Sequence, residues 1–160
     1  DFSDDKHRIF LFVGMEANEK NIEAFLKLDL PGTKVVVGDG PHRDLLMKRY
    51  PLVRFTGYLR GEELAKAMAL ANVFVFPSRT DTFGVVLLEA LACGVPVAGF
   101  PVQSCKDVLT DERVGILSED LRQAAMTALN LNAVACRDYA LHYSWEKCTQ
   151  QFVENLVPIK

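Results

Sequence analysis

The chain has 160 residues, a length that fits one ordinary domain able to bury roughly 70% of its unfolded surface. Hydrophobic residues make up 49% of it and charged residues 24%, the mixture typical of a globular protein. The net charge of −3 gives no electrostatic basis for a nucleic-acid partner, and no apolar run is long enough to predict a membrane-spanning helix.

Short apolar runs alternate with segments of helical spacing along the first hundred residues, and the runs end in glycine or other small residues. In chain order the predicted strands are Ile9–Val13, Lys34–Val37, Val53–Phe55, Val73–Phe76 and Val95–Ala98. The predicted helices between them are Glu19–Leu28, Pro41–Tyr50, Glu62–Leu70 and Val85–Ala92. After Gly99 the sequence predicts a loop through Lys106, a short strand near Gly115–Leu117, and two or three helices between Glu119 and Leu156.

This alternation requires crossover connections and therefore a parallel sheet covered by helices on both faces. The strands are nearly continuous runs of Val, Ile, Leu and Phe, as expected of strands buried on both faces. The predicted fold class is α/β: a Rossmann-like, doubly wound, mainly parallel sheet of about six strands with a helical C-terminus.

The four cysteines are widely spaced and form no C-x-x-C pair, so the sequence predicts no metal site. Cys93 and Cys136 lie in alanine-rich apolar runs and are expected to be small core residues. Unpaired cysteines favour a reducing compartment, and no signal peptide is visible ahead of the first apolar run, so we expect a cytoplasmic location. Because the chain starts at Asp1 without an initiator Met, we expect it to be a piece of a longer protein.

Ligands of such sheets bind beyond the carboxyl ends of the strands. Small or special residues stand at five of these ends: Gly14, Gly38-Asp39-Gly40, Thr56-Gly57, Pro77-Ser78 and Gly99. Glycines let a backbone approach a ligand closely, although each could equally serve a tight turn. The G-x-G at Gly38 and Gly40 lacks a third glycine and does not follow the first strand, so a dinucleotide fingerprint is not supported.

The segment Arg79–Ala90 leads from a strand end through a polar loop into a helix, and Gly84 marks the expected helix start. The first amides of a helix have no internal partners and attract phosphate. Glu89 lies in an otherwise apolar helix, where burial of its carboxylate is costly unless a partner satisfies it. That partner could be a basic residue, solvent, or a vicinal diol such as a ribose; Asp81 could cap the helix or meet a ligand.

The run FPSRTDTFGVVLLEALACGVPVA, residues Phe76–Ala98, closely resembles the donor-site signature of glycosyltransferase family 4, of the two-domain GT-B type. It is most similar to the form found in bacterial GDP-mannose-dependent mannosyltransferases and sulfolipid-synthase-like enzymes. Supporting motifs follow in the family's order and cover nearly the whole chain: EKNI at Glu19–Ile22, VVGDGP at Val36–Pro41, RFTGY at Arg54–Tyr58, EELAKAMALANVFVFPS at Glu62–Ser78 and YSWEKC at Tyr143–Cys148.

The resemblance implies that residues 1–160 form the nucleotide-sugar-binding C-terminal half of a glycosyltransferase whose N-terminal acceptor domain is absent. Family members transfer a sugar from a nucleotide diphosphate with retention of configuration and use no bound metal or cofactor. GDP-mannose is the favoured donor, a UDP-sugar remains open, and the expected acceptor is a glycolipid or polysaccharide of the cell envelope. A lipid-linked acceptor would place the protein peripherally at the inner face of the plasma membrane, and this fragment alone is expected to be inactive.

The family's two acidic positions, separated by seven residues, fall on Asp81 and Glu89. By resemblance Glu89 holds the ribose hydroxyls, Asp81 faces the donor sugar, and Lys20 neutralises the leaving diphosphate, so these three are the predicted catalytic residues. Asp81 replaces the more common Glu, which we interpret as a mark of the mannosyltransferase-like branch. The resemblance adds the following donor-binding residues, largely through their backbone: Gly14, Gly38, Phe55, Thr56, Gly57, Arg79, Phe83, Gly84, Val85 and Val86.

One departure from the family pattern bears on diphosphate binding. Met15 follows Gly14 where the family commonly has an arginine that pairs with the diphosphate. Losing one charge-assisted contact costs roughly 1.5–3 kcal/mol, or about ten- to a hundredfold in affinity, unless Arg79 substitutes for it. Two alternatives therefore stay open: a degenerate, non-catalytic binding or assembly module, and another Rossmann-like enzyme half such as a nucleotide-sugar epimerase.

Overall fold

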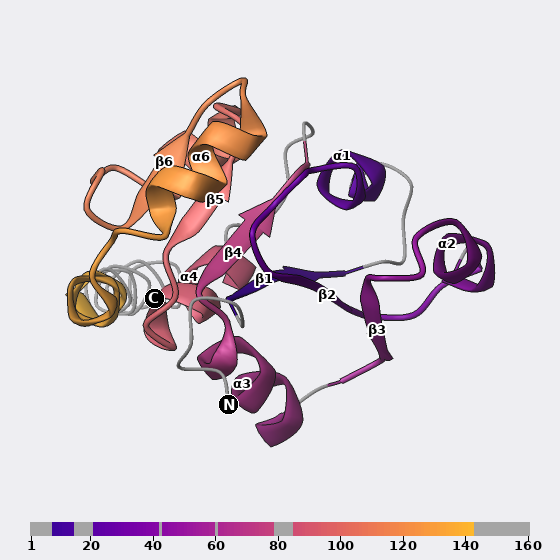
Figure 1. The fold of residues 1–160 in the computed structure, drawn as a ribbon. Coiled ribbons are helices and arrows are strands. Elements are labelled where there is room, and N and C mark those ends of the chain that lie inside the picture. The colour runs from indigo at the N-terminus through magenta and orange to yellow at the C-terminus, as the bar shows by residue number, and fades with distance from the viewer. Residues whose placement is uncertain (1–7, 15–20, 42, 60, 79–84, 143–160) are drawn as a thin grey trace, which may run out of the picture.

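The computed structural model describes residues 8–14, 21–41, 43–59, 61–78 and 85–142. Within them, six strands form one parallel sheet in the order β3-β2-β1-β4-β5-β6 (Figure 1). The strands are β1 (Ile9–Val13), β2 (Thr33–Val37), β3 (Arg54–Gly57), β4 (Val73–Phe76), β5 (Val97–Gly99) and β6 (Gly115–Leu117). The helices are α1 (Ile22–Leu26), α2 (Arg43–Arg49), α3 (Glu62–Leu70), α4 (Val85–Ala92), α5 (Gln103–Val108) and α6 (Leu121–Ala128), and residues 133–142 are also helical.

Each face of the sheet has its own hydrophobic core. Successive strand side chains point to opposite faces, so in β1 Phe10 and Phe12 join one cluster while Ile9 and Leu11 join the other. Helices α1, α2 and α6 cover the phenylalanine side, and α3, α4, α5 and the 133–142 helix cover the opposite side. Figure 1 shows the two layers, with α1 and α6 above the sheet and α3 below it. The doubly wound, mainly parallel α/β prediction is confirmed.

Helix α6 illustrates how the sequence forms one of these covers. Its buried residues recur at helical spacing, at Leu121, Ala124, Ala125 and Ala128, so one apolar stripe lies on the sheet. The carboxylate of Asp120 accepts a hydrogen bond of 3.1 Å from the backbone N–H of Gln123 and so caps the helix start. Alanines in the stripe let the helix backbone approach β5 and β6 closely.

The predicted boundaries of β1, α3, β4, α4 and β6 agree with the structure. The predicted loop from Gly99 to Lys106 is wrong in its second half, because α5 begins at Gln103 and buries Cys105 and Val108. Strand β3 is not buried on both faces as predicted: it is an edge strand, and Arg54 and Thr56 are exposed. The remaining ends differ by a few residues, as at β5, which starts at Val97.

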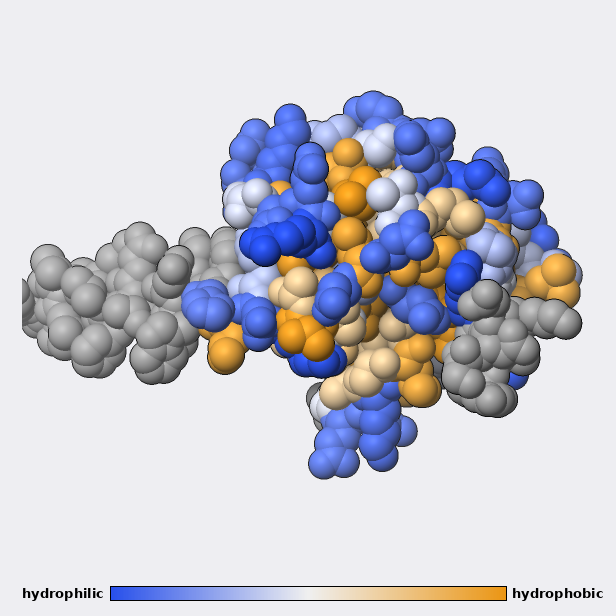
Figure 2. All heavy atoms as spheres, turned by 60° about the vertical axis from the view of Figure 1, so that its left-hand side comes forward, coloured by the Kyte–Doolittle hydropathy of each residue, from blue (hydrophilic) through white to orange (hydrophobic). Residues whose placement is uncertain are grey.

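The side of the molecule that carries β6, α6 and the 133–142 helix is turned forward in Figure 2, which shows hydrophilic side chains along much of its margin and hydrophobic ones gathered nearer its middle. On the 133–142 helix, Val134 and Leu141 are 55% and 68% exposed. They stand seven residues apart, and therefore on the same side of that helix. Among the described residues, no helix has the length and hydropathy to cross a membrane.

Candidate functional site at the carboxyl edge of the sheet

The strand order reverses between β1 and β4, because the chain builds outward from β1 through β2 to β3 and then returns to start β4 beside β1. In open α/β sheets the crevice for a ligand lies at this reversal, beyond the carboxyl ends of the two strands. Gly14 follows β1 and Pro77-Ser78 follow β4, so these residues lie at the reversal. The backbone of Gly14 has φ 105°, a conformation that side-chain-bearing residues rarely adopt.

Backbone hydrogen bonds link the ends of the three strands that carry predicted glycines. The N–H of Gly14 donates to the carbonyl of Val37 at 2.9 Å, and the N–H of Gly38 donates to the carbonyl of Gly57 at 2.9 Å. Gly38 and Gly57 also have positive φ, of 140° and 81°. The sheet therefore brings the predicted Gly14, Gly38 and Gly57 into one continuous edge that spans the ends of β1, β2 and β3.

Phe55 and Thr56 lie on β3 beside this edge. The ring of Phe55 is half-buried and packs against the core under α1 and α2. The ligand contact predicted for Phe55 is through its backbone. The exposed Thr56 donates its hydroxyl to the carbonyl of Gly57 at 2.9 Å. Both side chains thus make contacts within the protein.

Helix α4 starts at Val85, where it leaves the carboxyl edge of the sheet. Leu87, Ala90 and Leu91 are fully buried in the core, and Val86 is half-buried against it. Glu89 lies outside that apolar stripe and is exposed, so its carboxylate does not bear the cost of burial. Solvent is the alternative that the structure supports among the described residues, and it leaves the Glu89 carboxylate available to a ligand.

The remaining predicted site residues cannot be placed. Lys20, Arg79, Asp81, Phe83 and Gly84 lie outside the described residues, and so does Met15. Of Val85, the structure describes the backbone but not the side chain. Within the described ranges, no three His, Cys, Asp or Glu side chains gather as metal ligands.

Two residues at the carboxyl edge were not predicted to be part of the site. Asn21, at the start of α1, donates its side-chain amide to the carbonyl of Pro77 at 3.1 Å. Arg43, on α2, lies against Gly57: a Cβ placed on that glycine would be 3.3 Å from the Arg43 Nη1. Arg43 also pairs with Asp39, Nη1 to Oδ1, at 3.7 Å. Asn21 lies in the EKNI motif, and Arg43 follows the VVGDGP motif by two residues. Neither motif predicts a contact between segments that are distant in the sequence.

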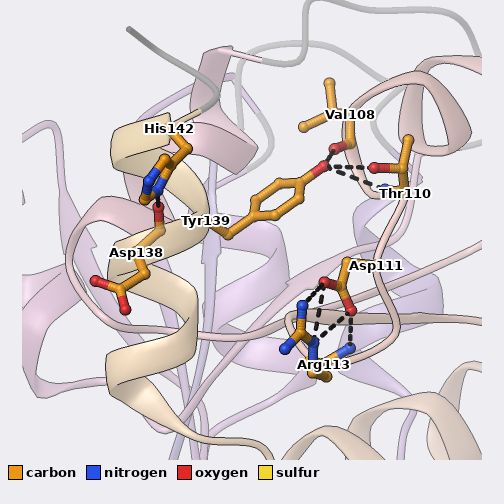
Figure 3. A network of polar contacts seen from close by, with 7 residues as sticks. All are labelled: Val108, Thr110, Asp111, Arg113, Asp138, Tyr139 and His142. Carbon is orange, nitrogen blue, oxygen red and sulfur yellow. Dashed lines mark hydrogen bonds and ion pairs between the residues drawn. The ribbon is translucent and has the colours of Figure 1, made fainter. Parts of the chain in front are cut away.

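A second polar network, at the turn after α5, has a structural role (Figure 3). The Tyr139 hydroxyl donates to the carbonyl of Val108 and meets the Thr110 hydroxyl at 2.9 Å, which ties the 133–142 helix to the turn. Beside it, hydrogen bonds from Arg113 lower the pKa of the half-buried Asp111 carboxyl. The turn leads into β6 at the amino edge of the sheet, opposite the candidate site.

The thiols of the described part of the chain are also structural. Burial raises the pKa of Cys105 to about 11, and it raises the pKa of Cys136 to about 11 against a smaller opposing effect of Arg137. A thiol in that state is a poor nucleophile at neutral pH. The prediction of a core role is confirmed for Cys136, whereas Cys93 is only half-buried.

The sheet order, the glycine-lined carboxyl edge and the two helical layers place the protein in the class of Rossmann-like α/β proteins. In this class ligands bind where the strand order reverses, which here is between β1 and β4. The sequence matches the family described as "Glycosyl transferases group 1" over residues 7–133, and the chain belongs to that family. This match includes every described residue of the carboxyl edge.

Individual relatives match this chain in sequence, and a solved structure matches its fold. The chain is 39% identical over 118 residues to a GDP-mannose-dependent alpha-mannosyltransferase of Mycobacterium tuberculosis, covering 72% of this chain and 31% of that protein. It is 35% identical over 113 residues to the sulfoquinovosyl transferase SQD2 of Arabidopsis thaliana, covering 67% and 22%. The crystal structure of Anabaena HepE in complex with UDP and glucose superposes with a TM-score of 0.70 at 18% identity, covering 96% of this chain and 49% of that one. This chain therefore spans less than half the length of these proteins.

Proposed function

We propose that this chain is the donor-binding half of a glycosyltransferase and that it holds a nucleotide-diphosphate sugar, with GDP-mannose as the first candidate and a UDP-sugar as the second. The observation that carries the proposal is the family match over residues 7–133, which includes the whole carboxyl edge from Gly14 to Glu89. The mycobacterial relative named for GDP-mannose supports the first donor, and the neighbour solved with UDP supports the second.

In this proposal the diphosphate lies over the β1/β4 reversal. Gly14, with no side chain and a φ of 105°, lets a phosphate approach the end of β1 closely. The amides that open α4 add partial positive charge from that helix. Lys20, which the family resemblance assigns to the diphosphate, neutralises the charge that develops there when the bond to the sugar breaks.

The nucleoside extends from this point along the glycine edge. Glu89, exposed on α4, accepts hydrogen bonds from the ribose hydroxyls. The ends of β2 and β3, joined by the Gly38–Gly57 hydrogen bond, face the base with main-chain groups. Asp81 and the segment through Gly84 hold the sugar, and transfer proceeds with retention of configuration and without a metal.

The acceptor belongs to the rest of the enzyme. Because the chain covers 31% of the mycobacterial relative and 22% of SQD2, we propose that it is one donor domain and that an N-terminal domain supplies the acceptor site. The acceptor is a glycolipid or polysaccharide of the envelope, and a lipid-linked acceptor places the enzyme at the inner face of the plasma membrane. Alone, this domain has no transferase activity.

A thermal-shift panel tests the donor proposal. A nucleotide at a hundredfold excess over its dissociation constant adds about 2.7 kcal/mol to the free energy of unfolding, which for 160 residues raises the melting temperature by roughly 5–11 °C. We expect GDP-mannose, GDP or a UDP-sugar to produce such a shift and free mannose to produce none. Absence of a shift with every nucleotide at millimolar concentration would refute donor binding.

One observation favours a second function, that of a non-catalytic nucleotide-sugar-binding or assembly module. Met15 stands where the family commonly has an arginine for the diphosphate. Comparing transfer by the full-length protein with that of its Met15→Arg variant separates the two functions. Activity with Met15 in place supports the enzyme, whereas activity that emerges only in the Met15→Arg variant supports the degenerate module.

A further inference from the structure

Asn21 has an unusual backbone and an unusual partner. It lies at φ 57° and ψ 40°, in the left-handed region, and it is the one non-glycine residue of the described ranges with a positive φ. Asparagine tolerates this conformation better than most residues. Its Nδ2 donates a hydrogen bond of 3.1 Å to the carbonyl of Pro77, which is 56 positions away in the sequence.

The bond joins the two connections that leave β1 and β4, where the strand order reverses. Asn21 stands between β1 and α1, and Pro77 directly follows β4. Strands β1 and β4 are neighbours, paired at Phe10 and Val73, and the strand order reverses between them. An amide from one connection therefore bonds to the main chain of the other at the place where the diphosphate is proposed to bind.

Both ends of this bond adjoin predicted donor contacts in the sequence. Lys20 immediately precedes Asn21, and Arg79 follows Pro77 by two positions. We propose that Asn21 is a positioning residue for diphosphate binding, whose amide holds the start of α1 against the end of β4 beside the place proposed for the diphosphate. This inference rests on the proposed function and adds a residue to which the family resemblance assigned no role.

Two substitutions separate the hydrogen bond from the backbone conformation. Asn21→Gly keeps the left-handed backbone at no steric cost and removes the amide. Asn21→Asp keeps the size of the side chain and its tolerance of positive φ, but it replaces the donating amide with a carboxylate that faces the Pro77 carbonyl. If the amide matters, both variants lose function; if only the left-handed backbone matters, neither does.

Calorimetric titration with GDP and with guanosine measures the effect. We expect Asn21→Gly to weaken GDP binding about tenfold, which corresponds to ~1.4 kcal/mol and to the net contribution of one hydrogen bond. Asn21→Asp weakens GDP binding at least as much, and guanosine, which lacks the diphosphate, keeps its affinity for both variants. A general structural role would instead lower both affinities together.

The outcomes are distinguishable. Wild-type affinity for GDP in the Asn21→Gly variant overturns the positioning role and leaves the proposed function intact. Equal weakening of GDP and guanosine also overturns it. If the wild-type chain binds neither GDP nor UDP, the proposed function fails and the positioning role fails with it.

Discussion

Replacing Gly57 by alanine tests whether the end of β3 requires a glycine. With φ at 81°, an alanine costs about 1–2 kcal/mol in backbone strain, and the reduced entropy of the unfolded chain offsets roughly 0.4–1 kcal/mol of that. The new Cβ would stand 3.3 Å from Nη1 and 3.7 Å from Cζ of Arg43, so the guanidinium must move. Moving it loosens the Arg43–Asp39 pair, which as a partly exposed pair contributes about 0–1 kcal/mol.

At the middle of these ranges the effects together lower the free energy of unfolding by about 1–2 kcal/mol. For a chain of 160 residues the melting temperature then falls by roughly 2–8 °C, which circular dichroism can measure. The matched control is the same substitution in an Arg43→Ala background, where the clash is absent and the backbone strain alone remains. An unchanged melting temperature for Gly57→Ala refutes the backbone requirement, and an equal loss in both backgrounds refutes the contact with Arg43.

Two further predictions concern parts of the fold away from the site. Tyr139→Phe removes the hydroxyl bound to Val108 and Thr110, so it should lower the free energy of unfolding by about 1–3 kcal/mol, which thermal melting measures. Its affinity for GDP, measured by calorimetry, should stay unchanged. A change in GDP affinity would contradict a purely structural role. Because burial raises the pKa of Cys105 and Cys136 to about 11, these thiols stay protonated in the folded state at pH values where they ionise in the unfolded chain, and that ionisation favours unfolding. The free energy of unfolding, measured in urea, should therefore fall as pH rises from about 9 toward 11, and a double Cys105→Ala, Cys136→Ala variant should lose that part of the decline; an identical decline in the variant would exclude these thiols.

Most of the fold could be predicted because hydrophobic periodicity determines it. The apolar run Ile9–Val13 and the glycine after it mark β1 and its end, and the apolar run Val73–Phe76 followed by Pro77 marks β4. Helix α5 carries a much weaker signal: it has six residues, follows Pro101 closely, and lacks a side-chain cap at Val102. Its stability comes from burying Cys105 and Val108 against the sheet, a tertiary effect that local sequence does not report.

The site was predictable in its chain positions and less so in its contacts. Glycine spacing located Gly14, Gly38 and Gly57, because parallel strands end at one edge. The sequence left open whether Glu89 meets a basic residue, solvent or a ligand, since a run of Val, Leu and Ala does not reveal that one side of α4 faces away from the core. Asn21 and Arg43 were missed because their partners, Pro77 and Gly57, are distant in sequence and adjacent only after folding.

The most direct test of the account is calorimetric titration of the wild-type chain with GDP, UDP and ADP, beside Glu89→Gln and a matched control. Glu112→Gln serves as the control because Glu112 is also exposed but lies in the turn before β6, at the opposite edge of the sheet. Loss of the charge-assisted bonds to the ribose costs roughly 1.5–3 kcal/mol, so Glu89→Gln should bind GDP about ten- to a hundredfold more weakly while Glu112→Gln binds as the wild type does. Failure of the wild type to bind any of the three nucleotides, or equal affinity of Glu89→Gln and wild type, would contradict a donor site at the carboxyl edge of this sheet.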